Sequence, residues 1–206
     1  MIHISRPRRG ISRFLDVWAS NAIDHAAKWM PSPLISFAAH VLFWPTLTWN
    51  YFVVHLNSEL NWHDEILYEE NKGRLILGGY PWPRSMVEKI ENENVSLVLN
   101  TVGEKQDYMF RENIKIRNFQ MRDFEEPMAK EVLAAVHELD AALQDGETVY
   151  IHCKAGKGRS ATVVLCWLVM KRGMSLEEAQ SLLSTRRPQV LSSLWKRSVV
   201  SELLDR

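Results

Sequence analysis

Residues 149–162 of this 206-residue chain, VYIHCKAGKGRSAT, decide its fold and its chemistry. The apolar run that ends at His152 predicts a buried strand, the glycines after it predict a loop, and the run from Arg159 predicts a helix. A loop between a strand and a helix start points backbone N–H groups, and the positive end of the helix dipole, at whatever it encloses. The stretch therefore predicts an anion cradle with Cys153 at its base.

Cys153 is predicted to be a nucleophile. A free thiol has a pKa of about 8.5, and a helix N-terminus with nearby cations lowers it to roughly 3.5–7.5, so that the thiolate becomes the resting form. Cys166, the other cysteine, lies in the apolar run 163–170 and is typical of a small buried side chain. Because no C-x-x-C pair exists, we expect no zinc site and no disulfide framework. A reaction through a cysteine nucleophile also predicts no metal requirement and no cofactor.

Arg159 follows the cysteine by six positions. Its planar guanidinium holds two phosphate oxygens at once and keeps its charge, so we expect it to bind phosphate and to stabilise the transition state. Ser160 is expected to hydrogen-bond the sulfur as it leaves, and His152 to organise the loop. The predicted substrate-binding residues are those of the loop: Lys154, Ala155, Gly156, Lys157, Gly158 and Arg159.

Two other loop chemistries fit the sequence less well. A nucleotide-binding G-x-x-x-x-G-K-[ST] loop would need glycine at position 151, which is Ile151, and Ser or Thr at position 158, which is Gly158. Sulfur transfer of the rhodanese type also uses a cysteine loop, but His152 and the Arg159-Ser160 pair favour phosphate. A phosphate-binding module without activity remains a further alternative.

The pattern His152-Cys153-x5-Arg159-Ser160 resembles the signature of the protein tyrosine phosphatases, in their dual-specificity branch. The loop 153–159 is also similar to that of the phosphatase and tensin homologue, a phosphoinositide phosphatase. Across roughly residues 40–206, the chain more closely resembles the mitochondrial tyrosine phosphatases that dephosphorylate phosphatidylglycerophosphate. The stretches that carry this resemblance are WPTLTWN (44–50), LILGG (75–79), Asn94-Val95 and the spacing into the loop.

This resemblance implies a cardiolipin-pathway enzyme with an anionic phospholipid substrate, on the matrix side of the mitochondrial inner membrane or on another intracellular membrane. The chain departs from the mammalian relatives at Lys157-Gly158, where they tend to carry Arg-Ser. A dual-specificity phosphoprotein phosphatase and a phosphoinositide phosphatase stay open, because the loop chemistry is the same and the depth of the pocket is not readable from sequence.

The resemblance also implies an aspartic acid as general acid, on a loop about 30 residues before the cysteine. Asp123, in the stretch MRDFEEP (121–127), stands there, and we predict that it protonates the leaving alkoxide and then activates water. Glu125 and Glu126 are the alternatives. Farther along, Arg186-Arg187 is interpreted either as a second anion contact or as a solvated helix end.

The chain from residue 59 to 206 is expected to form the phosphatase domain, an α/β fold with a parallel-centred sheet flanked by helices. Apolar runs predict strands at 74–79, 95–101, 114–119 and 148–152. Helices are expected at 85–92, 127–143, 159–171, from 175 onward and at 192–204. Pro127 is predicted at a first helical position, Gly173 at a C-cap and Ser175 in a capping box.

The N-terminal part has a different composition. Residues 1–28 carry five Lys or Arg against two acids, which is typical of a mitochondrial transit peptide or of a plain basic arm. Residues 29–58 hold no Asp, Glu, Lys or Arg, and five of the eight tryptophans lie in or beside them. This apolar helical segment is predicted to span a membrane, to lie in its interface, or to pack as a hairpin on the domain, and we favour membrane association. The formal net charge of zero gives no argument for nucleic acid.

Overall fold

The structure is a computed structural model that describes residues 31–68, 73–104 and 110–204. The predicted basic arm, residues 1–28, lies outside the described residues, and so do residues 29 and 30 of the apolar segment.

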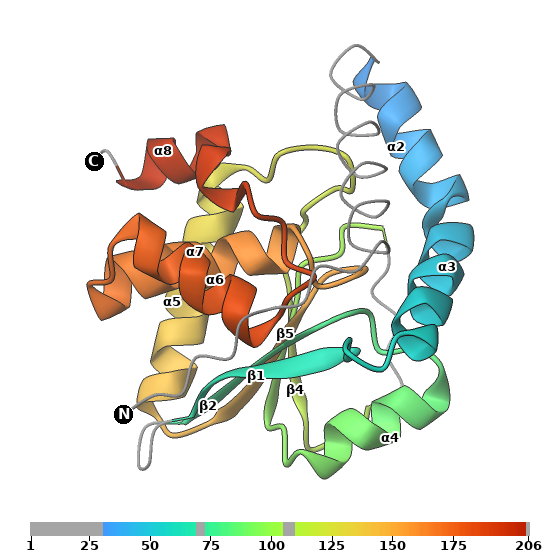
Figure 1. Cartoon of the computed structure of the whole chain (residues 1–206), viewed down its shortest axis with the longest axis horizontal. Coiled ribbons are helices and arrows are strands. Elements are labelled where there is room, and N and C mark those ends of the chain that lie inside the picture. The colour runs from blue at the N-terminus through green and yellow to red at the C-terminus, as the bar shows by residue number, and fades with distance from the viewer. Residues whose placement is uncertain (1–30, 69–72, 105–109, 205–206) are drawn as a thin grey trace.

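A five-stranded sheet forms the centre of the molecule, in the order β1-β2-β5-β3-β4 (Figure 1). The strands are β1 (His63–Tyr68), β2 (Arg74–Gly78), β3 (Leu97–Asn100), β4 (Lys115–Asn118) and β5 (Thr148–His152). Strands β2, β5, β3 and β4 run parallel, and β1 pairs antiparallel with β2 at the edge. The predicted α/β fold with a parallel-centred sheet is confirmed, whereas edge strand β1 was not predicted, because its first three residues are polar.

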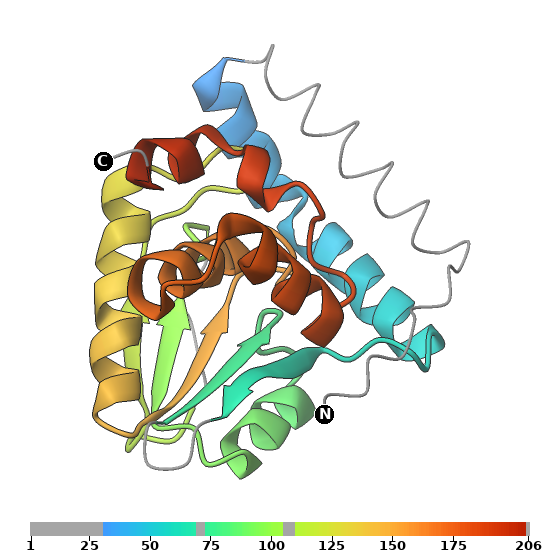
Figure 2. The same ribbon diagram turned by 60° about the vertical axis from the view of Figure 1, so that its left-hand side comes forward.

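Successive residues of β5 point to opposite faces of the sheet and so supply two apolar cores. Val149 and Ile151 join the core beneath α5 (Ala129–Gln144), α6 (Arg159–Arg172), α7 (Leu176–Arg186) and α8 (Ser198–Leu204). Tyr150 joins a second core with residues of α3 (Phe43–Leu56) and α4 (Arg84–Asn92). The helices therefore cover both faces of the sheet (Figures 1 and 2).

Helix ends follow the sequence signals in two of three places. Ser175 and Glu178 form a complete capping box before α7, and Gly173 ends α6 in the left-handed region at φ 66°. The prediction for Pro127 was wrong by two residues, because Met128 has extended backbone angles and is the N-cap of α5. Pro127 therefore lies just before the helix instead of opening it.

The predicted helix at 192–204 is broken into two pieces. A short 3₁₀ helix covers Leu194–Lys196, and Arg197 then takes an extended conformation before α8 starts at Ser198. The backbone N–H of Ser198 donates to the Glu126 carboxylate at 3.0 Å, and the Ser198 hydroxyl also donates to it. The loop 121–127, which carries Asp123, is thus bound to the start of α8.

The apolar segment forms α2 (Ser32–Val41) and α3, with Leu42 between them (Figure 1). The inner side of α3 packs on the domain through Phe43, Leu47 and Val54, all buried in the second core. Of the three arrangements expected for the apolar segment, α3 therefore shows the packing on the domain. Neither α2 nor α3, nor any other helix in the described part of the chain, has the length and apolar character needed to cross a bilayer.

Candidate active site

The loop between β5 and α6 surrounds the sulfur of Cys153, as the sequence predicted. Gly156 donates its backbone N–H to Cys153 Sγ at 3.2 Å. Gly156 has φ 67°, and a Cβ there would lie 2.3 Å from the carbonyl oxygen of Gly78. Only glycine fits this close approach to the end of β2, so the loop packs tightly against the sheet.

The charge state of Cys153 results from opposing effects. The side chain is buried, which raises the pKa of the thiol, but the charge of Arg159 and hydrogen bonds from Ser160 and Gly156 outweigh burial and lower the pKa to about 7. A large fraction of Cys153 is therefore thiolate at neutral pH. Cys166 differs, because burial raises its pKa to about 12, as expected for a structural cysteine.

Arg159 is held on three sides at the start of α6. Its Nη1 donates to the Glu104 carboxylate at 2.9 Å and to the Met121 carbonyl at 2.8 Å, and its Nη2 lies 3.1 Å from Asp123 Oδ1. Only 4% of the residue is exposed. The guanidinium is therefore fixed in orientation next to the sulfur, as a bidentate phosphate contact requires.

Asp123 lies beside the loop, next to the same guanidinium. Its carboxylate pairs with Arg159 and with the ammonium of Lys154. Burial raises the pKa of Asp123, but the two cations lower it by more. The net shift of the pKa is therefore downward, and the side chain is a carboxylate at neutral pH. The sequence predicts Asp123 on a loop before the cysteine, and the structure brings it next to Lys154 and Arg159 of the catalytic loop.

The two lysines of the loop have different surroundings. Lys154 is 5% exposed, and its ammonium lies 5.0 Å from the ring centre of Phe124 and 5.9 Å from that of Phe43. Lys157 is half-buried and donates to Asn50 Oδ1 of α3 at 3.0 Å. Both lysines therefore meet α3, which sequence reasoning treated as a separate segment.

His152 supports the loop from below, consistent with the role predicted for it. Its ring is fully buried, stacks on Tyr150 with an interplanar angle of 28°, and contacts the Cys153 carbonyl through Nδ1 at 3.2 Å. Its backbone carbonyl accepts the N–H and the hydroxyl of Thr101, each at 2.9 Å. Burial lowers the pKa of the imidazole to about 3, so it is neutral at physiological pH.

Arg187 braces the outside of the loop. Its Nε donates to the Gly156 carbonyl at 2.9 Å and its Nη2 to the Ala155 carbonyl at 3.1 Å, while Nη1 pairs with Asp64 of β1 at 2.6 Å. Arg187 is 1% exposed, so the solvated-helix-end interpretation is wrong for this residue and applies to exposed Arg186.

Glu104 is a functional-site residue that the sequence analysis missed. Its side chain is 2% exposed, and one carboxylate oxygen accepts from Arg159 while the other accepts the backbone N–H of Asp123 at 2.5 Å. It thus ties the guanidinium to the loop that carries Asp123. No local motif marks it, because its partners lie 55 and 19 positions away.

Comparison with known proteins agrees with this geometry. Residues 75–201, more than half of the chain, match the family model described as the dual specificity phosphatase catalytic domain. The chain belongs to the dual-specificity phosphatase family. It is therefore a cysteine-dependent phosphatase.

Among relatives of this dual-specificity phosphatase, two are phosphatidylglycerophosphate phosphatases of Arabidopsis thaliana. PTPMT1 is 32% identical over 81% of this chain, and PTPMT2 is 31% identical over 82%. The chain spans 50% of the length of the first and 74% of the second. The phosphatidylglycerophosphatase and protein-tyrosine phosphatase 1 of Rattus norvegicus is 28% identical over 80% of this chain and 86% of its own length.

Solved structures share the fold. Tk-PTP in its active form has a TM-score of 0.56 and 25% identity, with 66% of this chain and 95% of that chain covered. The crystal structure of PTPMT1 in complex with PI(5)P has a TM-score of 0.56 and 22% identity, with coverages of 69% and 94%. The second likeness shows the fold alone.

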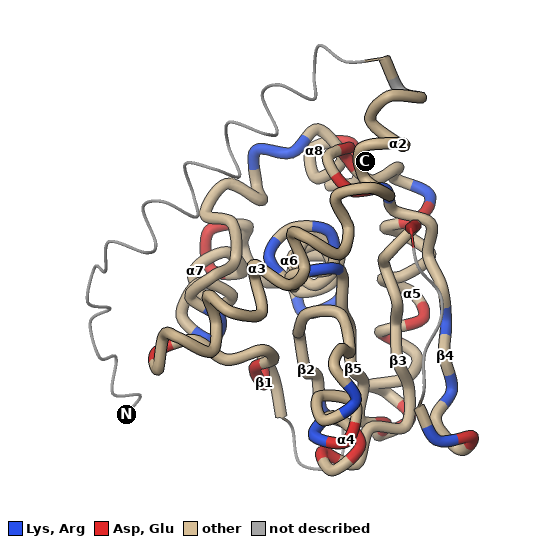
Figure 3. Tube along the Cα trace, turned by 90° about the vertical axis from the view of Figure 1, so that its right-hand side faces the viewer, with Lys and Arg blue, Asp and Glu red and all other residues tan. Residues whose placement is uncertain are grey.

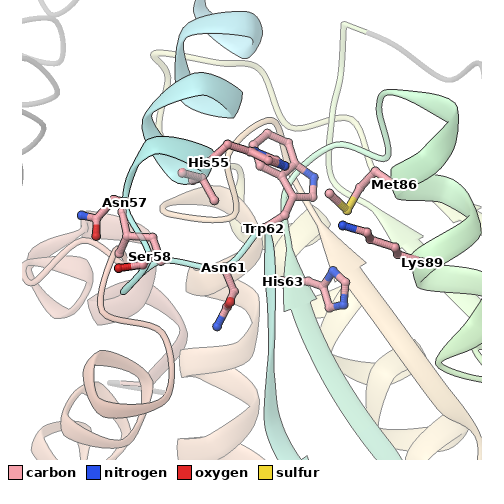
Figure 4. Close-up of a pocket in the computed structure, with 10 residues that line it drawn as sticks. His55, Asn57, Ser58, Asn61, Trp62, His63, Met86 and Lys89 are labelled. Atoms are coloured by element: carbon pink, nitrogen blue, oxygen red, sulfur yellow. The ribbon is translucent and has the colours of Figure 1, made fainter.

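A pocket of about 320 Å³ lies beside the end of α3 (Figure 4). Residues from the end of α3, from β1 and from α4 line it, among them His55, His63 and Lys89. None of its lining residues belongs to the loop 153–159. Within residues 31–68, 73–104 and 110–204, no cluster of His, Cys, Asp and Glu has the arrangement of a metal site.

Proposed function

We propose that this dual-specificity phosphatase converts phosphatidylglycerophosphate to phosphatidylglycerol through a phosphocysteine on Cys153. The observation that carries the proposal is the position of α3, an uncharged helix that contacts both loop lysines and exposes large apolar side chains. A phosphate site beside an apolar surface suits a phosphomonoester carried on a lipid. The similarity to relatives named as phosphatidylglycerophosphate phosphatases supports the same substrate.

In the first step, the Cys153 thiolate attacks phosphorus. An S–P bond forms while the bond from phosphorus to the glycerol oxygen breaks, and Asp123 gives its proton to the leaving alkoxide. Arg159 and the backbone N–H groups of the loop bind the phosphoryl oxygens, where negative charge gathers. Because Arg159 is already fixed by Glu104 and Met121, little reorganisation is needed as the transition state forms.

In the second step, water attacks the phosphocysteine. Asp123, now a carboxylate, takes a proton from the water, and the S–P bond breaks to release inorganic phosphate. The Ser160 hydroxyl stabilises the thiolate that leaves, the role that the sequence predicts for it. The residues of the loop thus serve both steps without a metal or another cofactor in the reaction.

The proton on Asp123 depends on the substrate. In the free protein, Arg159 and Lys154 hold the carboxylate in its charged form. A phosphate dianion that binds Arg159 weakens this pairing and adds negative charge nearby, and both effects raise the pKa of Asp123. The substrate itself therefore prepares the general acid.

The proposal includes a membrane surface as partner. On α2, Leu34, Phe37 and Val41 are exposed at the i, i+3, i+7 spacing of one helix face, and on α3 Trp49, Phe52 and Leu56 repeat it. In Figure 3 the trace of α2 carries neither blue nor red. Exposed apolar patches rich in Trp and Phe favour the interface of a bilayer, so we propose that α2 and α3 lie on the membrane.

We place the enzyme on the matrix side of the mitochondrial inner membrane, in the pathway to cardiolipin. The Arg-rich composition of residues 1–28 and the resemblance to mitochondrial tyrosine phosphatases support this location. Localisation of the full chain with a C-terminal fluorescent tag tests this proposal. We expect mitochondrial fluorescence, and we expect it to disappear when Arg6, Arg8 and Arg9 are replaced by Ala.

Phosphate release tests the substrate. The purified full chain is given phosphatidylglycerophosphate, a phosphoinositide and a phosphotyrosine peptide side by side, with Cys153→Ser as the blank. We expect kcat/KM to be highest for phosphatidylglycerophosphate. Preference for the peptide would overturn the lipid proposal and favour a phosphoprotein phosphatase, an activity suggested by the dual-specificity family model.

A further inference from the structure

The inner face of α3 follows a regular spacing. Phe43, Leu47 and Val54 are 1%, 0% and 6% exposed, and position 50 completes the 4-3-4 spacing with Asn50. Asn50 is the polar member of this otherwise apolar stripe. An amide among apolar neighbours costs free energy unless its oxygen and nitrogen are both hydrogen-bonded, so its contacts indicate why it stands there.

Both ends of the Asn50 amide are hydrogen-bonded. Its Nδ2 donates to the Thr46 carbonyl, one turn earlier in α3, at 2.8 Å. Its Oδ1 accepts from Lys157 Nζ at 3.0 Å, across 107 positions of sequence. Because a carbonyl and an ammonium can pair with these ends in one way only, the amide orientation is determined. Asn50 therefore fixes the end of a long side chain of the catalytic loop.

The contact differs in kind from the one that holds the other loop lysine. Lys154 pairs with the Asp123 carboxylate, and Phe43 of the same α3 stripe lies against its ammonium. Asn50 offers Lys157 a neutral oxygen, which orients the ammonium. Fixing a lysine in advance lowers the entropy cost of using it to bind an anion.

We propose that Asn50 is a positioning residue that holds the Lys157 ammonium of the catalytic loop to receive the second anionic group of the substrate headgroup. For phosphatidylglycerophosphate this group is the phosphodiester, so the inference rests on the proposed function. The apolar segment is then part of the active site as well as a membrane contact. Its role is in substrate affinity and not in the chemical step.

The experiment compares Asn50→Leu and Asn50→Asp with the unaltered full chain on three substrates. These are p-nitrophenyl phosphate, which has one phosphate; the soluble deacylated headgroup, which has the monoester and the phosphodiester; and phosphatidylglycerophosphate in vesicles.

For the headgroup and the lipid, Asn50→Leu should raise KM about tenfold and leave kcat unchanged, because one hydrogen bond to a charged group is lost. Asn50→Asp should raise KM at least as much, because its carboxylate neutralises Lys157. For p-nitrophenyl phosphate, kcat/KM should stay within about twofold.

A double-mutant cycle shows whether Asn50 acts through Lys157. In the Lys157→Met background, Asn50→Leu should have no further effect on KM, because the contact is already absent. Asn57→Leu, the same change at the other end of the segment, is the matched control, since the Asn57 side chain accepts the backbone N–H of Glu59. It should leave all three substrates unaffected.

Two outcomes would overturn the inference. A parallel fall of kcat on all three substrates, with a lower unfolding temperature, would give Asn50 a purely structural role. If Asn50→Leu raised KM as much in the Lys157→Met background as in the unaltered protein, Asn50 would not act through Lys157. The proposed function fails on a different result, namely that the unaltered protein shows no preference for phosphatidylglycerophosphate over a phosphotyrosine peptide.

Discussion

At the scale of single residues, the charge of each catalytic side chain is set by its neighbours. Burial alone would keep Cys153 protonated, and Arg159 with the hydrogen bonds of the loop reverses this. Burial also raises the pKa of Asp123, and the charges of Arg159 and Lys154 outweigh it and lower the pKa. Arg159 therefore lowers the pKa of both the nucleophile and the general acid.

The alkylation rate of Cys153 measures the effect of Arg159. In the unaltered protein, the rate of reaction with iodoacetamide should rise with pH around a midpoint of about 7, because the thiolate is the reactive form. Arg159→Ala removes the largest effect that lowers the pKa, so its midpoint should move to higher pH. Cys166 should not contribute, since burial raises its pKa to about 12, and Cys153→Ser is the blank. An unmoved midpoint in Arg159→Ala would contradict this assignment.

Asp123→Ala tests the general acid. Alkyl phosphates have poor leaving groups, so we expect kcat on glycerol phosphate to fall by roughly 10²–10⁴-fold, and kcat on p-nitrophenyl phosphate to fall much less. Glu126 is bound to Ser198, and Glu125 lies 3.8 Å from Arg122, which leaves both less suited to the role. An unchanged rate on the alkyl phosphate would move the role to one of these two glutamates.

At the scale of elements, the catalytic loop is predictable because its parts are contiguous, whereas its supports are not. Cys153, Arg159 and the glycines stand in one stretch of sequence, and the strand and helix around them are strongly apolar. Arg187 contacts Gly156 of the loop across 31 positions of sequence, and Asp64 contacts Arg187 across 123 positions. Neither Arg187 nor Asp64 stands in a motif. Strand β1, which carries Asp64, was missed because an edge strand does not need a continuous apolar pattern.

The Arg187 brace should be important for stability. Arg187→Met leaves Asp64 without its buried partner, and breaking such a pair costs about 3–5 kcal/mol of unfolding free energy. Urea unfolding measures this change, and kcat should fall as well, because the loop carbonyls lose their donor. Arg186→Met is the matched control, since Arg186 is exposed and its loss should stay within about 0.5 kcal/mol. Equal effects of the two substitutions would contradict the brace.

At the scale of the whole molecule, the apolar segment and the phosphatase fold share one core. Phe43 packs edge-on against Tyr80 at 5.3 Å between ring centres, and Tyr51 contacts Trp62 and Trp82. Composition identified the segment as apolar, but the division of its residues between an inner and an outer face depends on how α3 docks. The domain boundary at residue 59 and a separate anchor at 29–58 stay predictions.

The outer face of α3 is open to test on membranes. Trp49 and Phe52 are 67% and 55% exposed, so Trp49→Glu with Phe52→Glu should leave the unfolding free energy within about 1 kcal/mol. Co-sedimentation with anionic vesicles should weaken at least about tenfold, because two large apolar side chains no longer enter the interface. Undiminished binding would show that another surface contacts the membrane.

The most direct test of the whole account is to trap the covalent intermediate on the proposed substrate. Phosphatidylglycerophosphate with radioactive phosphorus in its monoester is mixed with the full chain, the reaction is quenched in acid within one turnover, and label on the protein is counted. We expect label on the peptide that contains Cys153. This label should be absent in Cys153→Ser and, once formed, longer-lived in Asp123→Ala. Phosphate release at the normal rate by Cys153→Ser, or label on a different residue, would contradict it.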